Sequence, residues 1–330
     1  MRILVVGGAG MIGRKLAERL ARDGALGSDP ISHLALADVV QPELDTPAAF
    51  DVETVVADVA EPGAARDLLS GRPDVIFHLA AVLSGEAEAD LEKGYRVNLD
   101  GTRFLLDGIR AVGGGYAPRV VFASSIAVFG TPLPEVIGDD QALTPLTSYG
   151  TQKAIGELLL TDYTRRGILD GVGIRLPTIC VRPGKPNRAA SGFFSSIIRE
   201  PLEGHEAVLP VPDDVRHWHA SPRAAVGFLL HAASLDGGAL DHRRCLTMPG
   251  VSVTVAEQIA ALRRIAGEDA ARLIRREPDE TVMRIIAGWP RSFDARRASS
   301  LGFTAEASFD EIIHAHVEDE LDGRIPAGRS

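Results

Sequence analysis

Short runs of β-branched and aliphatic residues alternate with longer amphipathic stretches through the first half of the chain. The apolar runs span residues 3–6, 34–37, 54–57, 75–77, 120–123 and 172–176. The candidate helices span residues 11–22, 64–69, 91–112 and 148–166. Continuous apolar strands separated by helical patterns are typical of a parallel sheet covered by helices on both faces. The alternation therefore predicts an α/β fold with a doubly wound parallel sheet.

The pattern changes after Val181, where prolines become frequent and helical patterns predominate from Val255 onward. Proline interrupts regular elements, so this change indicates a different packing unit. We expect one domain over residues 1–180 and a smaller, mostly helical lobe over residues 181–330. Within residues 213–235, the string SPRAAVGFLLHAA has a helical pattern, and we expect it to pack back on the first domain.

Composition excludes several classes of partner. The formal net charge of −10, with arginines scattered among acidic residues, argues against binding to nucleic acid. Cys180 and Cys245 stand far apart and in no metal-ligand spacing, so neither a disulfide framework nor a metal site is expected. The apolar run that ends at Val6 is too short for a signal core or a membrane span. We therefore expect no membrane partner and a cytoplasmic location.

A glycine-rich turn follows the first apolar run and opens the first helical pattern. In GGAGMIG, Gly7 permits a tight turn, Gly10 lets the backbone approach a pyrophosphate, and Gly13 lets helix and strand pack closely. Met11 and Ile12 lie at the start of the helix, whose free N–H groups would face the phosphates. The motif predicts a dinucleotide site on a Rossmann sheet, although a plain tight turn has the same glycines.

The second strand ends in Asp38, twenty-five residues beyond Gly13. A carboxylate there accepts hydrogen bonds from the adenosine ribose and repels a 2′-phosphate, so NAD is favoured over NADP. The next two strands end at the same edge of the sheet, where further cofactor contacts are expected. These candidate contacts are Asp58, Val59, Leu79, Ala80 and Ala81. The preceding His78 is expected to be a packed core histidine.

Tyr149 and Lys153 stand four residues apart at the start of a helical pattern, so their side chains share one face. A nearby ammonium would lower the pKa of the tyrosine, whose oxygen can then take a hydroxyl proton as hydride leaves. Ser124 and Ser125 end the fifth strand, where a hydroxyl can stabilise charge on the reacting oxygen. Each motif alone is common, but their joint occurrence predicts an NAD-dependent oxidoreductase.

Several strings together resemble the extended short-chain dehydrogenase/reductase superfamily, the NAD-dependent epimerase/dehydratase group. They are GGAGMIG, HLAA, VNLDGT, SSIAVFG, the Y-x-x-x-K pair and FDARRASSLGF, and they extend over nearly the whole chain. The resemblance implies that Tyr149 accepts or donates the proton and that Lys153 orients the tyrosine. It also implies that Ser125 is the partner hydroxyl, with Ser124 as the alternative and as a cofactor contact.

The same resemblance implies further roles. Asn98 would hold the active-site helix beside the cofactor, and Pro177 and Thr178 would line the nicotinamide. Phe129 departs from the pattern, because many sugar-modifying members carry tyrosine there. Related enzymes pair the helices equivalent to residues 91–112 and 148–166, so we expect a homodimer.

Longer strings narrow the resemblance to D-erythronate dehydrogenases, which oxidise a four-carbon sugar acid at C2 to 2-oxotetronate with NAD. They are AAVLSGEAEADLEKGYRVNLDGTR, TSYGTQKAIGELLL, RLPTICVRPGKPN and SPRAAV. The resemblance implies a small 2-hydroxy acid as substrate. Two alternatives stay open: a nucleotide-sugar 4-epimerase, which uses the same serine, tyrosine and lysine, and a non-catalytic NAD-sensing protein on the same fold.

A sugar acid needs a cation for its carboxylate and polar groups for its hydroxyls. The planar fork of arginine suits a carboxylate, which favours Arg182 and Arg223. Asn187 lies with Lys185 and Arg188 just beyond the sixth strand. Ser84, beside Glu86 in the loop after the fourth strand, is a candidate for the substrate hydroxyls, and it could equally cap a helix. The His217-Trp218-His219 patch is a candidate for closing the pocket, and two histidines alone do not indicate a metal.

Overall fold

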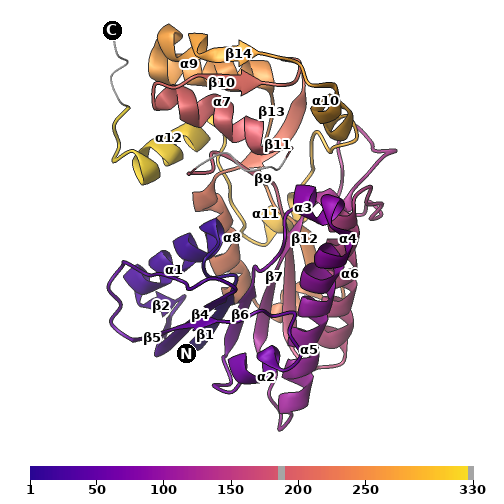
Figure 1. The fold of residues 1–330 in the computed structure, drawn as a ribbon. Helices are drawn as coiled ribbons and strands as arrows, with labels where there is room; N and C mark the ends of the chain where they lie inside the picture. Colours follow the sequence, from indigo (N-terminus) through magenta and orange to yellow (C-terminus); the bar gives the residue numbers. More distant parts are fainter. Residues whose placement is uncertain (185–189, 326–330) are drawn as a thin grey trace.

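A seven-stranded sheet lies between two layers of helices, and a second group of elements covers one end of it (Figure 1). We describe the protein from a computed structural model, which describes residues 1–184 and 190–325. The strand order is β12-β8-β7-β6-β1-β4-β5, and every neighbouring pair is parallel. The predicted doubly wound parallel sheet is therefore confirmed.

The strand register brings the candidate site residues to one edge of the sheet. The strands are β1 (Arg2–Val6), β4 (His33–Asp38), β5 (Asp51–Val56), β6 (Val75–His78), β7 (Arg119–Ser125), β8 (Asp170–Leu176) and β12 (Cys245–Thr247). Val6 lies beside His78, and Ser125 lies beside Leu176. Because all the strands run the same way, their carboxyl ends meet at a single edge, where ligands bind in such folds.

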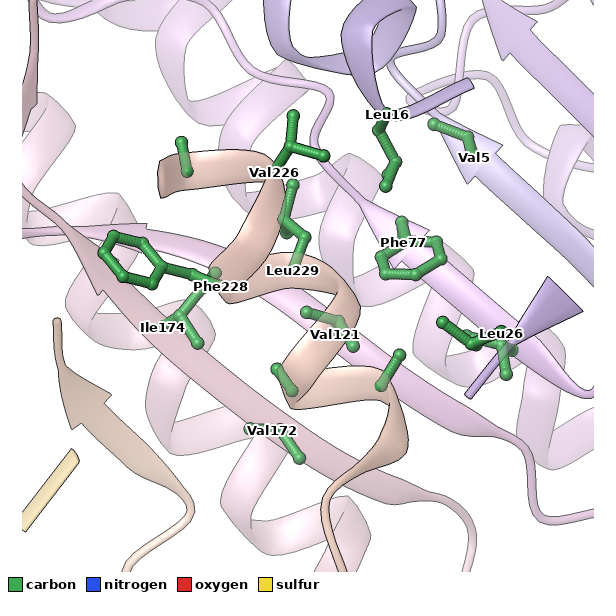
Figure 2. Close-up of a cluster of buried hydrophobic side chains, with 14 of the residues drawn as sticks. Val5, Leu16, Leu26, Phe77, Val121, Val172, Ile174, Val226, Phe228 and Leu229 are labelled. Atoms are coloured by element: carbon green, nitrogen blue, oxygen red, sulfur yellow. The ribbon is translucent and has the colours of Figure 1, made fainter. Parts of the chain in front are cut away.

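Successive side chains of a strand point to opposite faces of the sheet, and here both sets are apolar. Helices therefore cover both faces. One face is covered by α1 (Met11–Asp23), α8 (Pro222–Ser234) and α11 (Arg296–Ser300). The other is covered by α2 (Ala64–Leu68), α5 (Gly101–Val112) and α6 (Ser148–Arg165). In Figure 2, Phe228 and Leu229 of α8 lie against Val121 and Ile174 of the sheet. Each such fully buried side chain contributes about 1.5–3 kcal/mol.

The second part of the structure is held by a separate apolar core of helices and short strands. Its strands are β9 (Thr178–Ile179), β11 (Arg216–Ala220) and β13 (Val251–Thr254) in one sheet, and β10 (Ala207–Leu209) and β14 (Ile274–Arg276) in another. Its helices are α7 (Gly192–Leu202), α9 (Val255–Arg272), α10 (Glu280–Ile286) and α12 (Phe309–Glu320). Between them α8, β12 and α11 return to the first sheet. We propose a domain boundary near residue 180, with α8, β12 and α11 assigned to the first domain although they follow it in the sequence.

The remaining short elements connect these layers. They are β2 (Ala25–Leu26), β3 (Asp29–Pro30), α3 (Ser84–Ala89), the 3₁₀ helices η2 (Ile126–Val128) and η3 (Gly237–Leu240), and the segment described next. Within residues 1–184 and 190–325, no helix is both long and apolar enough to span a membrane.

The structure adds detail to one sequence-based expectation and overturns another. The helix expected over residues 91–112 is divided into α4 (Leu91–Gly94), the π-helix η1 (Tyr95–Asp100) and α5. A π-turn widens the helix, which periodicity alone does not reveal, and such turns are frequent at functional sites. The run at residues 54–57 was expected to be covered on both faces. It belongs to β5, an edge strand that is mostly exposed.

Candidate active site

The glycine turn between β1 and α1 is sterically fixed at two positions. Gly7 has a φ of +99°, and a Cβ there would lie 2.6 Å from the backbone nitrogen of Ala80. A Cβ at Gly13 would overlap the carbonyl oxygen of Gly7. Gly10 precedes α1, where no side chain caps the first turn, and a Cβ on it would meet only the Gly7 oxygen, at 3.4 Å. The N–H groups that open α1, at Met11 and Ile12, therefore suit an anionic group.

The carboxylate of Asp38 lies against this turn. Its Oδ2 accepts a hydrogen bond from the backbone N–H of Ala9 at 3.0 Å, and its Oδ1 accepts one from Val39 at 2.7 Å. These bonds hold the carboxylate at the end of β4, beside the glycines. A ribose hydroxyl can donate to the carboxylate there, whereas a phosphate would be repelled.

We expect Asp38→Ala to weaken discrimination between the two nicotinamide cofactors, because it removes the charge that repels a 2′-phosphate. The ratio of kcat/KM for NAD to kcat/KM for NADP should fall on the order of tenfold. Asp51→Ala, at the opposite end of the neighbouring strand, is the matched control and should leave the ratio unchanged. An unaltered ratio in Asp38→Ala would contradict the ribose role.

The other expected cofactor positions lie at the same edge. The backbone N–H groups of Leu79 and Ala80 both donate to the carbonyl of Val6, at 2.8 and 2.9 Å, which joins the end of β6 to the glycine turn. Ala81 follows them and is half-buried. Asp58 is held by Arg96 of η1 at 2.8 Å, a pairing that the sequence did not suggest. The residue after it, Val59, is buried against Gly101 of α5.

His78 is a packed core histidine, as expected. It is buried, and its Nε2 lies 2.8 Å from the hydroxyl oxygen of Thr102. Burial, together with the charge of Lys153, lowers its pKa to about 3. The imidazole is therefore neutral near pH 7, which leaves it no role as a proton carrier there.

Tyr149, Lys153 and Ser125 come together at the carboxyl end of β7. The side chain of Thr147 caps α6 by accepting from the N–H of Gly150 at 3.0 Å, which fixes the turn that carries Tyr149. Lys153 is buried, and its Nζ donates to the carbonyl of Ala123 at 2.8 Å. The same Nζ lies 5.7 Å from the centre of the Tyr149 ring. The Ser125 hydroxyl lies beside the phenol of Tyr149 and favours its ionised form.

The two serines that end β7 face opposite ways, because successive side chains alternate along a strand. The hydroxyl of Ser124 is buried and donates to Oε1 of Glu157 at 2.5 Å. That contact directs Ser124 away from Tyr149. The Ser125 oxygen accepts from the N–H of Ala127 at 3.1 Å, so its own proton can be donated to the Tyr149 oxygen or to a ligand oxygen beside it. The geometry therefore separates the two serines, which the sequence left as alternatives.

The pKa of Tyr149 differs from the sequence-based expectation. Burial raises it above its ordinary value, while Ser125 and the charge of Arg182 oppose the rise. Lys153 was expected to lower this pKa, but its ammonium is directed to the backbone of β7. The cation that acts on the phenol in this structure is therefore Arg182.

Asn98 of η1 links the loop after β6 to the helix that carries Tyr149. Its Oδ1 accepts from the N–H of Val82 at 2.8 Å, and its Nδ2 donates to Oε1 of Gln152 on α6 at 2.7 Å. The π-turn places this side chain in the interior. Asn98 thus positions α6, and Gln152 is a participant that sequence reasoning missed.

Arg182 is the predicted substrate cation that lies near Tyr149. Its Nε donates to the carbonyl of Ile179 at 2.9 Å, and its Nη2 donates to the hydroxyl of Ser191 at 2.8 Å. Its backbone N–H donates to the hydroxyl of Ser195 at 3.1 Å. These bonds give the guanidinium a fixed position, which a carboxylate site requires.

Thr178 and the histidines of β11 form a buried polar core. His217 donates from Nδ1 to the carbonyl of Pro290 at 2.8 Å, since that oxygen can only accept. Its Nε2 then accepts from the hydroxyl of Thr178, which follows Pro177, at 2.7 Å. Trp218 and His219 are also buried. The idea that this patch closes the pocket was therefore wrong, because its side chains are packed inside the protein. The two histidines lie against Phe194 of the second core, and Trp218 lies against Phe293 in a separate apolar cluster.

Other predicted substrate residues fall elsewhere. Arg223 donates to Asp319 at 2.6 Å and pairs with Glu318 at 2.9 Å, both on α12. This corrects its assignment as a carboxylate anchor, because two acids already engage its guanidinium. Ser84 begins α3 and is half-buried, with Leu83 as the capping residue. Asn187 lies outside the described residues, with Lys185 and Arg188.

Comparison with known proteins identifies the family. Residues 3–222 match the model of the NAD dependent epimerase/dehydratase family. The chain belongs to this family. The family description itself names NAD. Together with the dehydrogenase relatives described next, it makes the chain an oxidoreductase of the extended short-chain dehydrogenase/reductase type, as the motifs predicted.

Relatives within the epimerase/dehydratase family match the chain over nearly its full length. A D-erythronate dehydrogenase of Cupriavidus necator is 49% identical over 324 residues, which are 97% of this chain and 98% of the relative. A D-erythronate dehydrogenase of Haemophilus influenzae is 40% identical over 321 residues, which are 97% of this chain and 100% of the relative. A crystal structure described as a nucleoside-diphosphate-sugar epimerase from Agrobacterium tumefaciens is 62% identical with a TM-score of 0.97, and the match covers 98% and 96% of the chains. The predicted likeness to D-erythronate dehydrogenases is confirmed.

Proposed function

We propose that this enzyme oxidises the 2-hydroxyl of a small sugar acid with NAD, and that its substrate is D-erythronate, which becomes 2-oxotetronate. The observation that carries the proposal is the convergence of Tyr149, Ser125 and Lys153 at the edge of the sheet that also holds the glycine turn. The near full-length similarity to two D-erythronate dehydrogenases supports the substrate class.

The three side chains fit the removal of two hydrogens from a secondary alcohol. In its ionised form, which Ser125 and the charge of Arg182 favour, the Tyr149 oxygen takes the hydroxyl proton. The C2–H bond breaks at the same time and its electron pair leaves as hydride, so that a C=O bond forms. Ser125 donates a hydrogen bond to the oxygen on which negative charge develops. Bound NAD would supply the hydride acceptor, and the residues that would hold it are the glycine turn and Asp38. The product pair is a 2-oxo acid and NADH, with one proton released.

Arg182 provides the feature that favours an acid over a neutral alcohol. Its charge acts on the phenol of Tyr149, and three hydrogen bonds fix its position. We therefore expect a carboxylate on the carbon next to C2 to bind this guanidinium when the 2-hydroxyl meets Tyr149. Charge-assisted hydrogen bonds of this kind are about twice as strong as neutral ones.

A second candidate function is nucleotide-sugar epimerisation, which the description of the Agrobacterium tumefaciens structure favours. An epimerase uses the same tyrosine, serine and lysine but returns the hydride to its own substrate, so it forms no net NADH. A non-catalytic NAD sensor would form none with any substrate. Net reduction of NAD therefore separates the three functions.

A substrate panel tests the proposal. The purified chain is mixed with NAD and, in turn, D-erythronate, L-threonate, a six-carbon aldonate, UDP-glucose and UDP-galactose, while NADH absorbance is followed. We expect D-erythronate to give NADH with a kcat/KM at least about tenfold above the longer acid. Interconversion of the UDP-sugars without NADH would establish the epimerase instead. Tight NAD binding without turnover of any compound would establish the sensor.

Assembly and location stay predictions. A homodimer through α5 and α6 is supported by Leu158, which is 67% exposed on α6 and offers apolar surface to a second copy. The cytoplasm is the location expected for an enzyme that uses free NAD and a small acid.

A further inference from the structure

A buried acid, Glu157, lies one helical turn beyond Lys153 on α6. Its carboxylate accepts from the hydroxyl of Ser124 at 2.5 Å and from Nη2 of Arg175 at 2.7 Å, and Nε of the same guanidinium lies 3.0 and 3.1 Å from its two oxygens. Arg175, on β8, stacks its guanidinium over Phe129 at 5.2 Å from the ring centre. Sequence analysis singled out neither member of this ion pair.

We propose that Glu157 is a positioning residue for the oxidation, acting through Lys153: it supplies the negative charge that keeps the buried ammonium in place against β7. The inference rests on the proposed function for its kinetic assay. Glu157 itself does not touch the reacting atoms, because Ser124 and Arg175 occupy its oxygens.

The surroundings of Lys153 explain why it needs this charge. Its Nζ contacts one carbonyl, that of Ala123, and lies 4.9 Å from the centre of the Phe122 ring. No carboxylate in the described part of the chain forms a direct ion pair with it, and Glu157 acts on it through charge alone. An ammonium removed from water and left unpaired is strongly disfavoured. A nearby anion is therefore required to keep it charged.

Glu157 is the anion among the titratable groups around Lys153. Tyr149 and Glu157 on α6 and His78 on β6 act on Lys153 or lie beside it, while Arg175 on β8 and Cys245 on β12 lie against Glu157. Burial raises the pKa of the Tyr149 phenol and of the Cys245 thiol, so both are neutral near pH 7. His78 is neutral as well. The negative charge that reaches the ammonium is that of Glu157.

The consequence is a defined pH dependence. Burial lowers the pKa of Lys153 to about 8, and the charge of Glu157 opposes this fall. The ammonium is present below that pH and is lost above it, so loss of Lys153 charge forms the descending limb of the activity profile. Removing the charge of Glu157 lowers the lysine pKa further, which moves that limb toward acid pH.

The experiment measures kcat/KM for D-erythronate against pH in the wild type and in Glu157→Gln. A second readout is the Kd of NADH, measured by fluorescence against pH. It follows Lys153 without turnover, because the ammonium can also donate a hydrogen bond to the nicotinamide ribose. In Glu157→Gln, the fall of kcat/KM at high pH and the matching rise of the NADH Kd are both expected to move about one pH unit toward acid. Glu157→Asp keeps the charge and should restore most of the wild-type profile. Asp162→Asn, an equal charge change at an exposed position of α6, should leave both profiles unchanged.

A double variant separates positioning from simple neutralisation of Arg175. Glu157→Gln/Arg175→Gln removes both charges of the buried pair, so neither position 157 nor position 175 keeps an unpaired ion. If Glu157 served only to neutralise Arg175, this variant would regain the wild-type limb. We expect its limb to stay shifted, because the anion that acts on Lys153 is still missing. It also keeps the inference testable should Glu157→Gln fail to fold.

The outcomes for the two proposals are distinct. A wild type that forms no NADH from D-erythronate overturns the proposed function, while the NADH-binding titration still tests Glu157. The positioning role is overturned if the pH profiles of Glu157→Gln and of the double variant fall at the same pH as those of the wild type, even if both variants are slower. A shift in those two variants, with none in Asp162→Asn, supports it.

Discussion

Replacing Tyr149 with phenylalanine is expected to lower kcat by about 10³-fold or more and to leave the Kd of NAD nearly unchanged. General acid–base catalysis contributes roughly 10²–10⁴-fold, and here one oxygen carries it. His78, the nearby alternative, is buried against Thr102 with a pKa of about 3, so it cannot replace the phenol. Steady-state rates and NAD titration of the variant measure the two quantities separately.

Tyr163→Phe is the matched control for this substitution. Tyr163 lies on the same helix, but its hydroxyl donates to Asp107 at 2.7 Å, on the side of α6 that faces α5. Its loss should leave kcat within about twofold, since it removes a single hydrogen bond far from the chemistry. A Tyr149→Phe enzyme that kept most of its rate would contradict the catalytic assignment.

Substituting Gly13 by alanine is expected to destabilise the protein and to raise the Kd of NAD at least about tenfold. The added Cβ would overlap the carbonyl oxygen of Gly7 and lie 3.0 Å from its carbon, so α1 must move away from β1. Overpacking of this kind costs about 1–3 kcal/mol of unfolding free energy. The displacement also moves the N–H groups at the start of α1, which is where the phosphates would bind.

Gly227→Ala provides the comparison, because it makes the same chemical change in a helix where a Cβ would have nothing within 4 Å. An exposed helical alanine is more favourable than glycine by about 1 kcal/mol. Thermal unfolding of the two variants should therefore move in opposite directions. Equal effects would show that the tight contact between Gly13 and Gly7 does not constrain the turn.

The parallel sheet could be predicted from the sequence because its strands are buried on both faces and so read as continuous apolar runs. The edge strand β5 was the exception, since exposure on the sheet edge cannot be inferred from a short run. The strand β12 was missed because it is only three residues long, Cys245–Thr247, and pairs with β8 from a part of the chain far along the sequence. The glycine turn, Asp38 and the Tyr149–Lys153 pair were found because local spacing encodes them.

The remaining site residues depend on contacts between distant segments. Arg223 reads as a free cation in the sequence, but α12 brings Asp319 and Glu318 to it from almost a hundred residues away. Glu157 reads as one acid among many on α6, and only the fold places it against Arg175 of β8. Neither pairing leaves a local signal. The pKa of Tyr149 is set by burial, which is likewise a property of the folded chain.

The most direct test of the account is a deuterium-transfer experiment with D-erythronate labelled at C2. If Tyr149 takes the hydroxyl proton while the hydrogen on C2 passes to nicotinamide, mass spectrometry will find one deuterium in the NADH formed, and the labelled substrate will react more slowly than the unlabelled one. Unlabelled NADH, or label that returns to the acid with no NADH produced, would contradict the proposed oxidation at C2.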